Sequence, residues 1–115
     1  MLAKKYRFHG HGSLRFLYKN GKTVRSSPIT LKYIANPRRK NCRFTVVVSK
    51  KVVKSAVRRN RIRRRIYEII RHELPTLKDS HDVAVIVFSS EVYSLESQIL
   101  TSTIKQLLSQ ANLYK

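Results

Sequence analysis

Apolar residues recur at helical spacing in three segments of this 115-residue chain. The first runs from Ser13 to Lys19 and ends at Asn20-Gly21. The second begins after Ser55, a good helix N-cap, continues to about Glu73 and is stopped by Pro75. The apolar stripes are Leu14, Leu17 and Tyr18 in the first segment, Ile62, Ile66, Ile69 and Ile70 in the second, and Leu100, Ile104, Leu107, Leu108 and Ala111 in a third near the C-terminus. The pattern predicts three helices.

Four other segments have the composition and periodicity of strands: Thr23–Ser27, Ile29–Ile34, Arg43–Val48 and Asp82–Phe88. The first is short and predicted to lie at a sheet edge. Turn residues from Asn36 to Asn41 separate the second and third, which are predicted to be antiparallel neighbours. The last is apolar at successive positions, as expected for a strand covered on both faces. The predicted order is α-β-β-β-α-β-α, in one domain spanning residues 1–115.

The segment around the helix predicted after Ser55 is also strongly basic. Between Ser49 and Arg65, nine of seventeen residues are Lys or Arg, and the whole chain carries a formal charge of +19. Residues 1–67 contain 21 Lys or Arg and no acidic residue. Such a surface is self-repelling unless a polyanion lies against it, and counterion release favours binding to nucleic acid. The alternatives are a solvated basic surface or one that binds anionic membranes.

Composition also limits the compartment and the kinds of site. Cys42 is the only cysteine, which excludes an intramolecular disulfide and a zinc site built on several thiolates. A reducing, cytoplasmic setting is expected. The N-terminal residues lack the apolar stretch of a secretion signal, and the longest aliphatic run, Val83–Phe88, is too short to cross a bilayer. No membrane association is predicted.

The acidic residues are poorly placed for metal-dependent hydrolysis. Glu68 and Glu73 are five residues apart and do not share a helix face, and Glu68 is expected to pair with Arg64. His9 and His11 flank Gly10 and are compatible with a metal or phosphate site, or with ordinary loop histidines near a basic surface. The sequence therefore predicts no catalytic residue.

The basic segment also resembles a known family. Ser49-Lys50-Lys51 leads to Ala56 and then to Arg59-Asn60-Arg61-Ile62-Arg63-Arg64, preceded by a Val-rich strand and followed by an amphipathic helix. This pattern resembles the RNR motif of the bacterial ribonuclease P protein subunit, and the resemblance extends over nearly the whole chain. It implies an α+β, single-domain α/β sandwich with a four-stranded mixed sheet. It also implies a left-handed β-α-β crossover around the RNR helix, against the usual right-handed rule.

The resemblance implies a noncatalytic protein subunit that helps a catalytic RNA remove the 5′ leader from precursor tRNA. Mg²⁺ would be held mainly by the RNA subunit, and the protein would need no cofactor for folding. The implied partners are the catalytic ribonuclease P RNA and precursor tRNA, with the protein itself monomeric. Two other classes stay open: a structural RNA-binding protein such as a ribosomal protein, and an autonomous protein nuclease.

Two sets of site residues follow from the resemblance. The face toward the catalytic RNA would comprise Lys50, Lys51, Arg59, Asn60, Arg61, Arg63 and Arg64. The cleft for the single-stranded leader would comprise Leu14, Tyr18 and Lys32. Leu14 and Lys32 replace aromatic residues of some family members, which makes a more electrostatic leader contact the expectation, and Leu14 is equally compatible with a core position. The family's metal site has no clear carboxylate match here and is unassigned.

Overall fold

The computed structural model describes residues 2–8 and 11–115, and its elements follow the predicted order. The helices are α1 (His11–Asn20), α2 (Ala56–Glu73) and α3 (Ser97–Gln110), and the strands are β1 (Lys22–Ser26), β2 (Ile29–Ala35), β3 (Arg43–Val48) and β4 (His81–Val87). Short 3₁₀ turns occupy Lys4–Tyr6 (η1), Leu74–Thr76 (η2) and Ser90–Ser94 (η3). The order α-β-β-β-α-β-α is confirmed, with boundaries within two residues of those predicted.

The strands form one mixed sheet in the order β1-β2-β4-β3. The predicted pairing of β2 with β3 is therefore wrong, because β4 lies between them, antiparallel to β2 and parallel to β3. The physical reason is the burial of β4. Its run Val83–Val85 is fully buried, and a strand without a polar face is best placed in the centre of a sheet.

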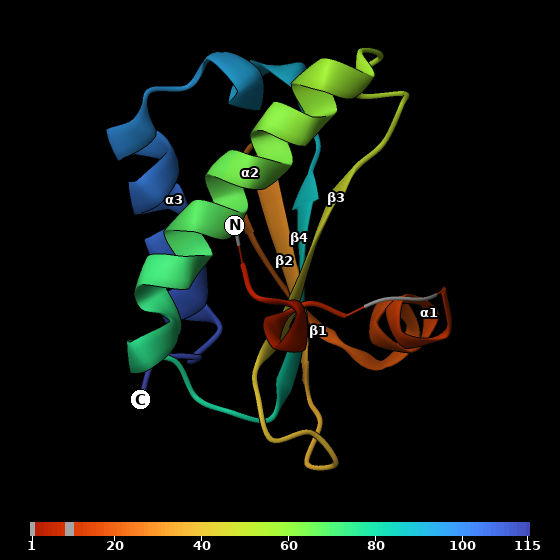
Figure 1. Ribbon diagram of the computed structural model, residues 1–115, viewed down its shortest axis with the longest axis vertical. Helices are drawn as coiled ribbons and strands as arrows, with labels where there is room; N and C mark the ends of the chain where they lie inside the picture. The colour runs from red at the N-terminus through yellow and green to blue at the C-terminus, as the bar shows by residue number, and fades with distance from the viewer. Residues whose placement is uncertain (1, 9–10) are drawn as a thin grey trace.

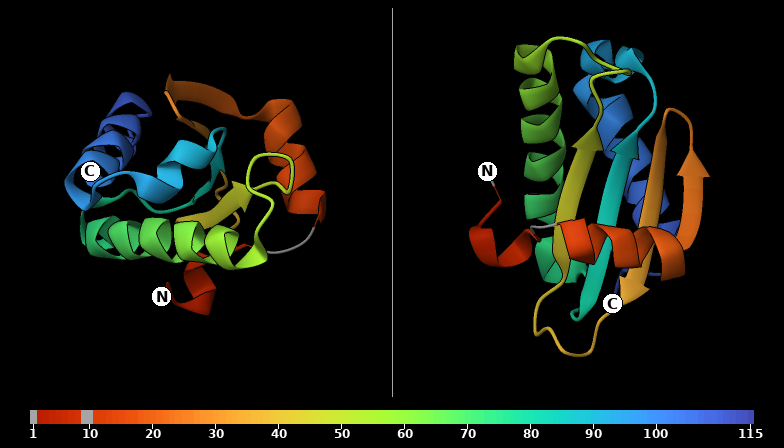
Figure 2. Two further views of the ribbon diagram at one scale, coloured as in Figure 1. Left: turned by 90° about the horizontal axis from the view of Figure 1, so that it is seen from above. Right: turned by 90° about the vertical axis from the view of Figure 1, so that its right-hand side faces the viewer.

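Helices cover both faces of this sheet. Figure 1 shows α2 and α3 on one face and α1 on the other. In the right-hand view of Figure 2, α1 crosses the near face, and the chain passes from β3 to its right-hand neighbour β4 through α2 on the far face. This arrangement is left-handed, so the implied crossover is confirmed, and it places the basic helix and α1 on opposite faces.

Each face has its own core. The larger core packs α2 and α3 on the sheet and contains the apolar stripes predicted for these two helices, with Ile62, Ile66 and Ile70 fully buried and Ile69 partly buried. Tyr67 joins them, and its hydroxyl accepts a hydrogen bond from the Val46 backbone N–H at 3.2 Å. The smaller core, under α1, consists of Phe8, Leu17 and Ala84, with Leu14, Ile34 and Ile86 packed against it.

Single residues explain where α2 begins and where α1 ends. The Ser55 side chain accepts a hydrogen bond from the Arg58 backbone N–H at 3.3 Å and so caps α2 as predicted. Gly21 ends α1, where a Cβ would lie only 2.6 Å from the Leu17 carbonyl oxygen. A glycine is needed there because the chain turns back closely against the helix. The hairpin from β1 to β2 contains a cis peptide bond at Ser27-Pro28.

A buried ion pair joins the beginnings of β3 and β4. Arg43 Nε and Nη2 donate to Asp82 Oδ1 and Oδ2, both at 2.9 Å, and Asn36 Nδ2 donates to Oδ2 at 2.9 Å. The two charged residues are register partners in the parallel pair. Both side chains are largely excluded from solvent. This pair therefore links the beginnings of β3 and β4 and, through Asn36, the end of β2.

Candidate nucleic-acid interface

Asn60, Arg61 and Arg64 are exposed together on one side of α2. At about 100° per residue these three positions fall within one third of the helix circumference, and the isoleucine stripe turns this group away from the sheet. No acidic residue occupies the first turn of α2. Arginine forks bind phosphate bidentately, and an asparagine amide both donates and accepts. Two guanidinium groups and one amide are thus held together on a rigid element.

Arginines on one flank of α2 form hydrogen bonds with the backbone around the double lysine. Arg59 Nη1 donates to the carbonyls of Val53 and Lys54, both at 2.9 Å. Four residues later, Arg63 Nη1 donates to Asn60 Oδ1 at 3.1 Å, and its Nη2 lies 3.5 Å from the Val48 carbonyl. Arg59 and Arg63 are both only partly exposed. They therefore have an architectural role in addition to the predicted contact with RNA.

The double lysine itself lies on the turn that follows β3. Lys50 and Lys51 are exposed, while the backbone N–H groups of Val52 and Val53 donate to the Ser49 carbonyl at 3.2 and 3.0 Å. Val53 is buried and anchors the turn to the larger core. The two ammonium groups are accordingly presented from an ordered turn, joined to α2 through the Arg59 contacts.

The opposite flank of α2 contacts η3, which the sequence gave no reason to place there. The Arg58 guanidinium lies 4.9 Å from the centroid of the Tyr93 ring, and Arg61 Nη1 donates to the Tyr93 hydroxyl at 3.2 Å. Arg65 donates to the carbonyls of Val92, Tyr93 and Leu95 at 3.1, 3.2 and 2.6 Å. Arg65 is thus occupied by structural hydrogen bonds, whereas Arg58 and Tyr93 extend the exposed basic face.

The structure brings together two of the three predicted cleft residues. Lys32 Nζ lies 5.6 Å from the centroid of the Tyr18 ring and donates to the Tyr18 carbonyl at 3.3 Å. Partial burial raises the pKa of Tyr18, although 40% of this residue remains accessible. Leu14 is partly buried against the smaller core. Tyr18 and Lys32 therefore present an aromatic ring and a cation together, and Leu14 mainly supports them.

A strongly basic hollow of about 390 Å³, separate from the α2 face, was not predicted. It lies between the N-terminal segment and the loop after β2, and its basic lining is Lys4, Lys5, Arg7, Arg38, Arg39, Lys40 and Arg43. No acidic residue lines it among the described residues. In Figure 1 this loop is at the bottom of the molecule and the first turns of α2 are at the top. Positive charge is therefore present at both ends of the sheet.

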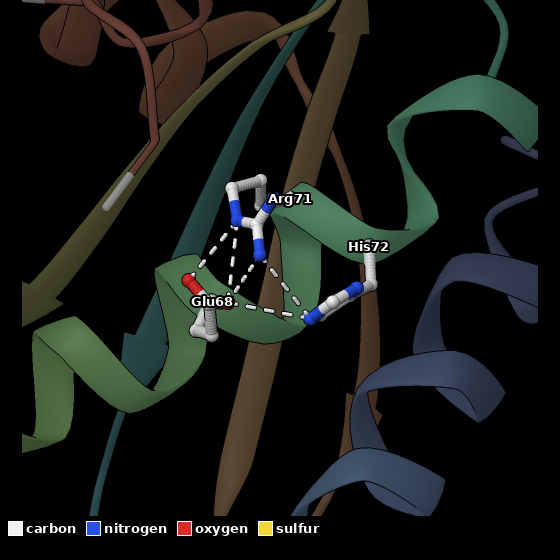
Figure 3. Close-up of polar contacts among 3 residues, drawn as sticks. All are labelled: Glu68, Arg71 and His72. Atoms are coloured by element: carbon white, nitrogen blue, oxygen red, sulfur yellow. Dashed lines mark hydrogen bonds and ion pairs between the residues drawn. The ribbon is translucent and has the colours of Figure 1, made fainter.

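Glu68, in the C-terminal half of α2, is held in ion pairs. Arg71 Nη2 lies 2.6 Å from Glu68 Oε1, and His72 Nε2 lies 3.3 Å from the same oxygen (Figure 3). The predicted pairing of Glu68 with Arg64 is wrong, because Arg71 and His72 take its carboxylate on the next turn. The hydrogen bond from Arg71 lowers the pKa of Glu68 to about 2. Glu68 is thus a poor proton acceptor at neutral pH.

Residues 2–8 and 11–115 contain no group of three or more His, Cys, Asp or Glu side chains suited to holding a metal ion. Of the histidine pair considered above, His9 lies outside the described residues. Within those same ranges, none of the helices is long and apolar enough to span a membrane.

Comparison with known proteins connects this geometry to a family. The family model described as Ribonuclease P matches residues 2–112. The chain belongs to the ribonuclease P protein family. It is 31% identical over 112 residues to the ribonuclease P protein component of Synechocystis sp., covering 97% of this chain and 90% of the relative. It is 32% identical over 111 residues to that of Clostridium kluyveri, covering 96% and 97%.

Solved structures of ribonuclease P proteins have the same fold. A mutant Staphylococcus aureus RNase P protein described as defective in mRNA degradation superposes with a TM-score of 0.87 at 23% identity, over 96% of this chain and 92% of the other. The Thermotoga maritima RNase P protein has a TM-score of 0.80 at 22% identity, over 90% and 96%. Family membership implies a protein component of an endoribonuclease in tRNA 5′ processing, with the ribonuclease P RNA as partner.

Proposed function

We propose that this chain is the noncatalytic subunit of ribonuclease P and that it holds the catalytic RNA and the 5′ leader of precursor tRNA in position. The main support for this proposal is that two different surfaces lie on opposite faces of one sheet (Figure 1). The α2 face offers Asn60, Arg61 and Arg64, and the α1 face offers Tyr18 beside Lys32. One small protein can then contact two RNA molecules and reduce the repulsion between them.

Each surface suits its proposed RNA. Phosphate oxygens of a folded RNA accept hydrogen bonds from Arg61, Arg64 and the double lysine Lys50-Lys51, which fixes orientation without reading sequence. A flexible leader exposes its bases, and a base can stack on the Tyr18 ring while Lys32 neutralises a phosphate. Arg59 and Arg63 contribute to the first surface with the donor groups that their carbonyl contacts leave open.

Hydrolysis is assigned to the RNA subunit in this proposal. The reaction needs ions that stabilise the attacking and leaving oxygens, and Mg²⁺ held mainly by the RNA would supply that chemistry. The protein would supply positioning and charge neutralisation, require no cofactor for its own folding, and act as a cytoplasmic monomer. Support comes from the described carboxylates, where Glu68 and Asp82 are engaged by arginine.

Reconstitution tests the function directly. Precursor tRNA should be mixed with a bacterial ribonuclease P RNA at low magnesium, with and without the protein, and 5′ processing followed on a gel. The protein should increase the rate over RNA alone, because it supplies positive charge that magnesium would otherwise provide. No increase would favour a structural RNA-binding role instead. Cleavage by the protein without the RNA would indicate an autonomous nuclease.

The Tyr18→Ala variant tests the leader surface. Loss of a base-stacking ring costs about 1–3 kcal/mol, so binding of precursor tRNA to the assembled enzyme should weaken by about fivefold or more. Binding of mature tRNA, which has no leader, should not change. The Tyr18→Phe variant keeps the ring and should retain affinity. Equal losses for both tRNAs would assign Tyr18 to the packing of α1 instead.

A further inference from the structure

Two exposed arginines of α2 contact the same tyrosine of η3. The Arg58 guanidinium lies 4.9 Å from the centroid of the Tyr93 ring, and Arg61 Nη1 donates to the Tyr93 hydroxyl at 3.2 Å. In the part of the chain that the structure describes, neither arginine forms an ion pair with a carboxylate. The two guanidinium groups are therefore held in place while their full positive charge is kept.

The backbone of η3 is fastened to the rest of the molecule, which fixes the position of the Tyr93 ring. Arg65 of α2 donates three hydrogen bonds to η3 and the residue after it, at the carbonyls of Val92, Tyr93 and Leu95. The Val92 side chain is fully buried in the larger core, and Tyr93 packs against the same core while partly buried. In Figure 1, η3 lies beside the upper half of α2, just before the chain enters α3. Tyr93 is thus a fixed platform for side chains of α2.

The chemistry of tyrosine explains how like charges can be held together here. Arg58 and Arg61 are three residues apart on α2, a spacing at which two cations destabilise a helix by mutual repulsion. A carboxylate at this place would hold both arginines but would also neutralise them. The Tyr93 ring instead attracts the Arg58 cation through its π-face, and its hydroxyl oxygen accepts one N–H from Arg61. Neither contact brings a negative charge, so an anionic ligand would still relieve the repulsion.

Most of the donor groups on both arginines stay available to such a ligand. A guanidinium carries five N–H groups. The Arg58 guanidinium donates none of them to the described residues, and Arg61 uses one for the Tyr93 hydroxyl. A phosphate accepts two parallel N–H bonds from one guanidinium fork. Two neighbouring forks therefore suit one phosphate group or two successive ones.

We propose that Arg58, Arg61 and Tyr93 form a phosphate-binding site for the backbone of the catalytic RNA, in which Tyr93 positions the two guanidinium groups. This inference rests on the proposed contact between α2 and that RNA. It adds Arg58 to the contact and gives Tyr93, which lies outside the basic segment, a positioning role without contact to the RNA. Arginines that are ordered before binding lose less conformational entropy when the phosphate arrives. Affinity is then raised by pre-organisation rather than by additional charge.

The Tyr93→Leu variant tests the positioning, since leucine keeps apolar bulk against the core and removes both the ring and the hydroxyl. Binding of the whole protein to a bacterial ribonuclease P RNA is titrated over a salt series. Affinity should fall by about fivefold or more, because two long side chains must then be ordered on binding. The slope of log affinity against log salt should not change, since the same phosphates still release their counterions. An unchanged affinity would overturn the inference.

A double-mutant cycle separates positioning from direct contact with RNA. In the Arg58→Ala/Arg61→Ala background no arginine is left for Tyr93 to position, so Tyr93→Leu should cause no further loss of affinity. In the Arg64→Ala background the loss should remain complete, because Arg64 is exposed on the same helix but makes no polar contact with Tyr93. Equal losses in both backgrounds would mean that Tyr93 binds the RNA itself or only supports the fold, and would overturn the inference.

The Tyr93→Phe variant keeps the packing of η3 and tests the two arginine contacts separately. It retains the ring beside Arg58 and removes only the acceptor for Arg61, so its loss of affinity should be smaller than that of Tyr93→Leu, at the same salt slope. A loss as large as that of Tyr93→Leu would remove Arg58 from the site and overturn the two-arginine arrangement.

The outcomes also distinguish this inference from the function on which it rests. If Arg58→Ala/Arg61→Ala weakens binding of the catalytic RNA and Tyr93→Leu does not, only the positioning role fails. If the arginine variant also leaves both affinity and salt slope unchanged, the proposed contact between this part of α2 and the catalytic RNA fails as well.

Discussion

Replacing Asp82 with alanine should lower the free energy of unfolding by about 3–5 kcal/mol. The substitution leaves the Arg43 guanidinium buried without its two 2.9 Å hydrogen bonds to carboxylate, and Asn36 loses its acceptor. An uncompensated buried charge is far more costly than a lost surface pair. Urea denaturation followed by circular dichroism measures the change, provided that the denaturant slope stays constant.

The control for this prediction is Asp79→Ala. Asp79 is exposed, and its removal changes the net charge by the same amount, so it should alter stability by no more than about 0.5 kcal/mol. In the Arg43→Ala/Asp82→Ala double variant, both charges are absent, and part of the lost stability should return. Equal effects of the two aspartate substitutions would mean that the buried pair does not hold β3 and β4 together.

The second large effect is expected for the Arg61→Ala/Arg64→Ala variant in binding to the catalytic RNA. If each guanidinium contacts one phosphate, the slope of log affinity against log salt should fall by about 2. The affinity ratio between 50 mM and 200 mM salt should then shrink by about tenfold. Both residues are exposed, so the fold should be retained. Filter binding or fluorescence titration over a salt series measures the slope.

A matched variant separates local contacts from total charge. Lys105 and Lys115 are exposed, and replacing both with alanine also removes two positive charges, but Lys105 is on α3 and Lys115 follows it. This variant should reduce the slope much less, since only charges near the RNA release counterions. If the two double variants behave alike, binding depends on net charge and α2 provides no specific face.

The secondary structure could be predicted because each element carries a local signal. Ser55 caps α2, Gly21 ends α1, and three apolar stripes have helical spacing. The neighbour of β3 could not be predicted in that way, since a β-branched strand pairs equally well with several partners. Turn residues between β2 and β3 suggested a hairpin, whereas the unbroken burial of β4 was the stronger indication and pointed to the centre of the sheet.

Within the candidate site, the basic helix likewise has features that its local sequence predicts and contacts that only the fold determines. Its sequence predicted a buried isoleucine stripe, and the family resemblance implied a face that includes Asn60, Arg61 and Arg64, which the structure leaves exposed. It did not distinguish Arg65, whose three carbonyl acceptors belong to a segment 27–30 residues away. Nor did it indicate that Tyr93 would lie beside Arg58. Charge alone cannot separate an arginine that supports the fold from one that is open to a ligand.

By itself, the sequence determined the elements, the excess of positive charge and, through the motif that begins at Arg59, the family. These depend on residues close together in the chain, whose spacing sets helix faces and strand periodicity. Only the tertiary structure decided the central position of β4, the Arg58–Tyr93 contact and the basic hollow beside the N-terminal segment. Those features join residues distant in sequence, and they arise because the chain must bury β4 on both faces, which brings its distant segments into contact.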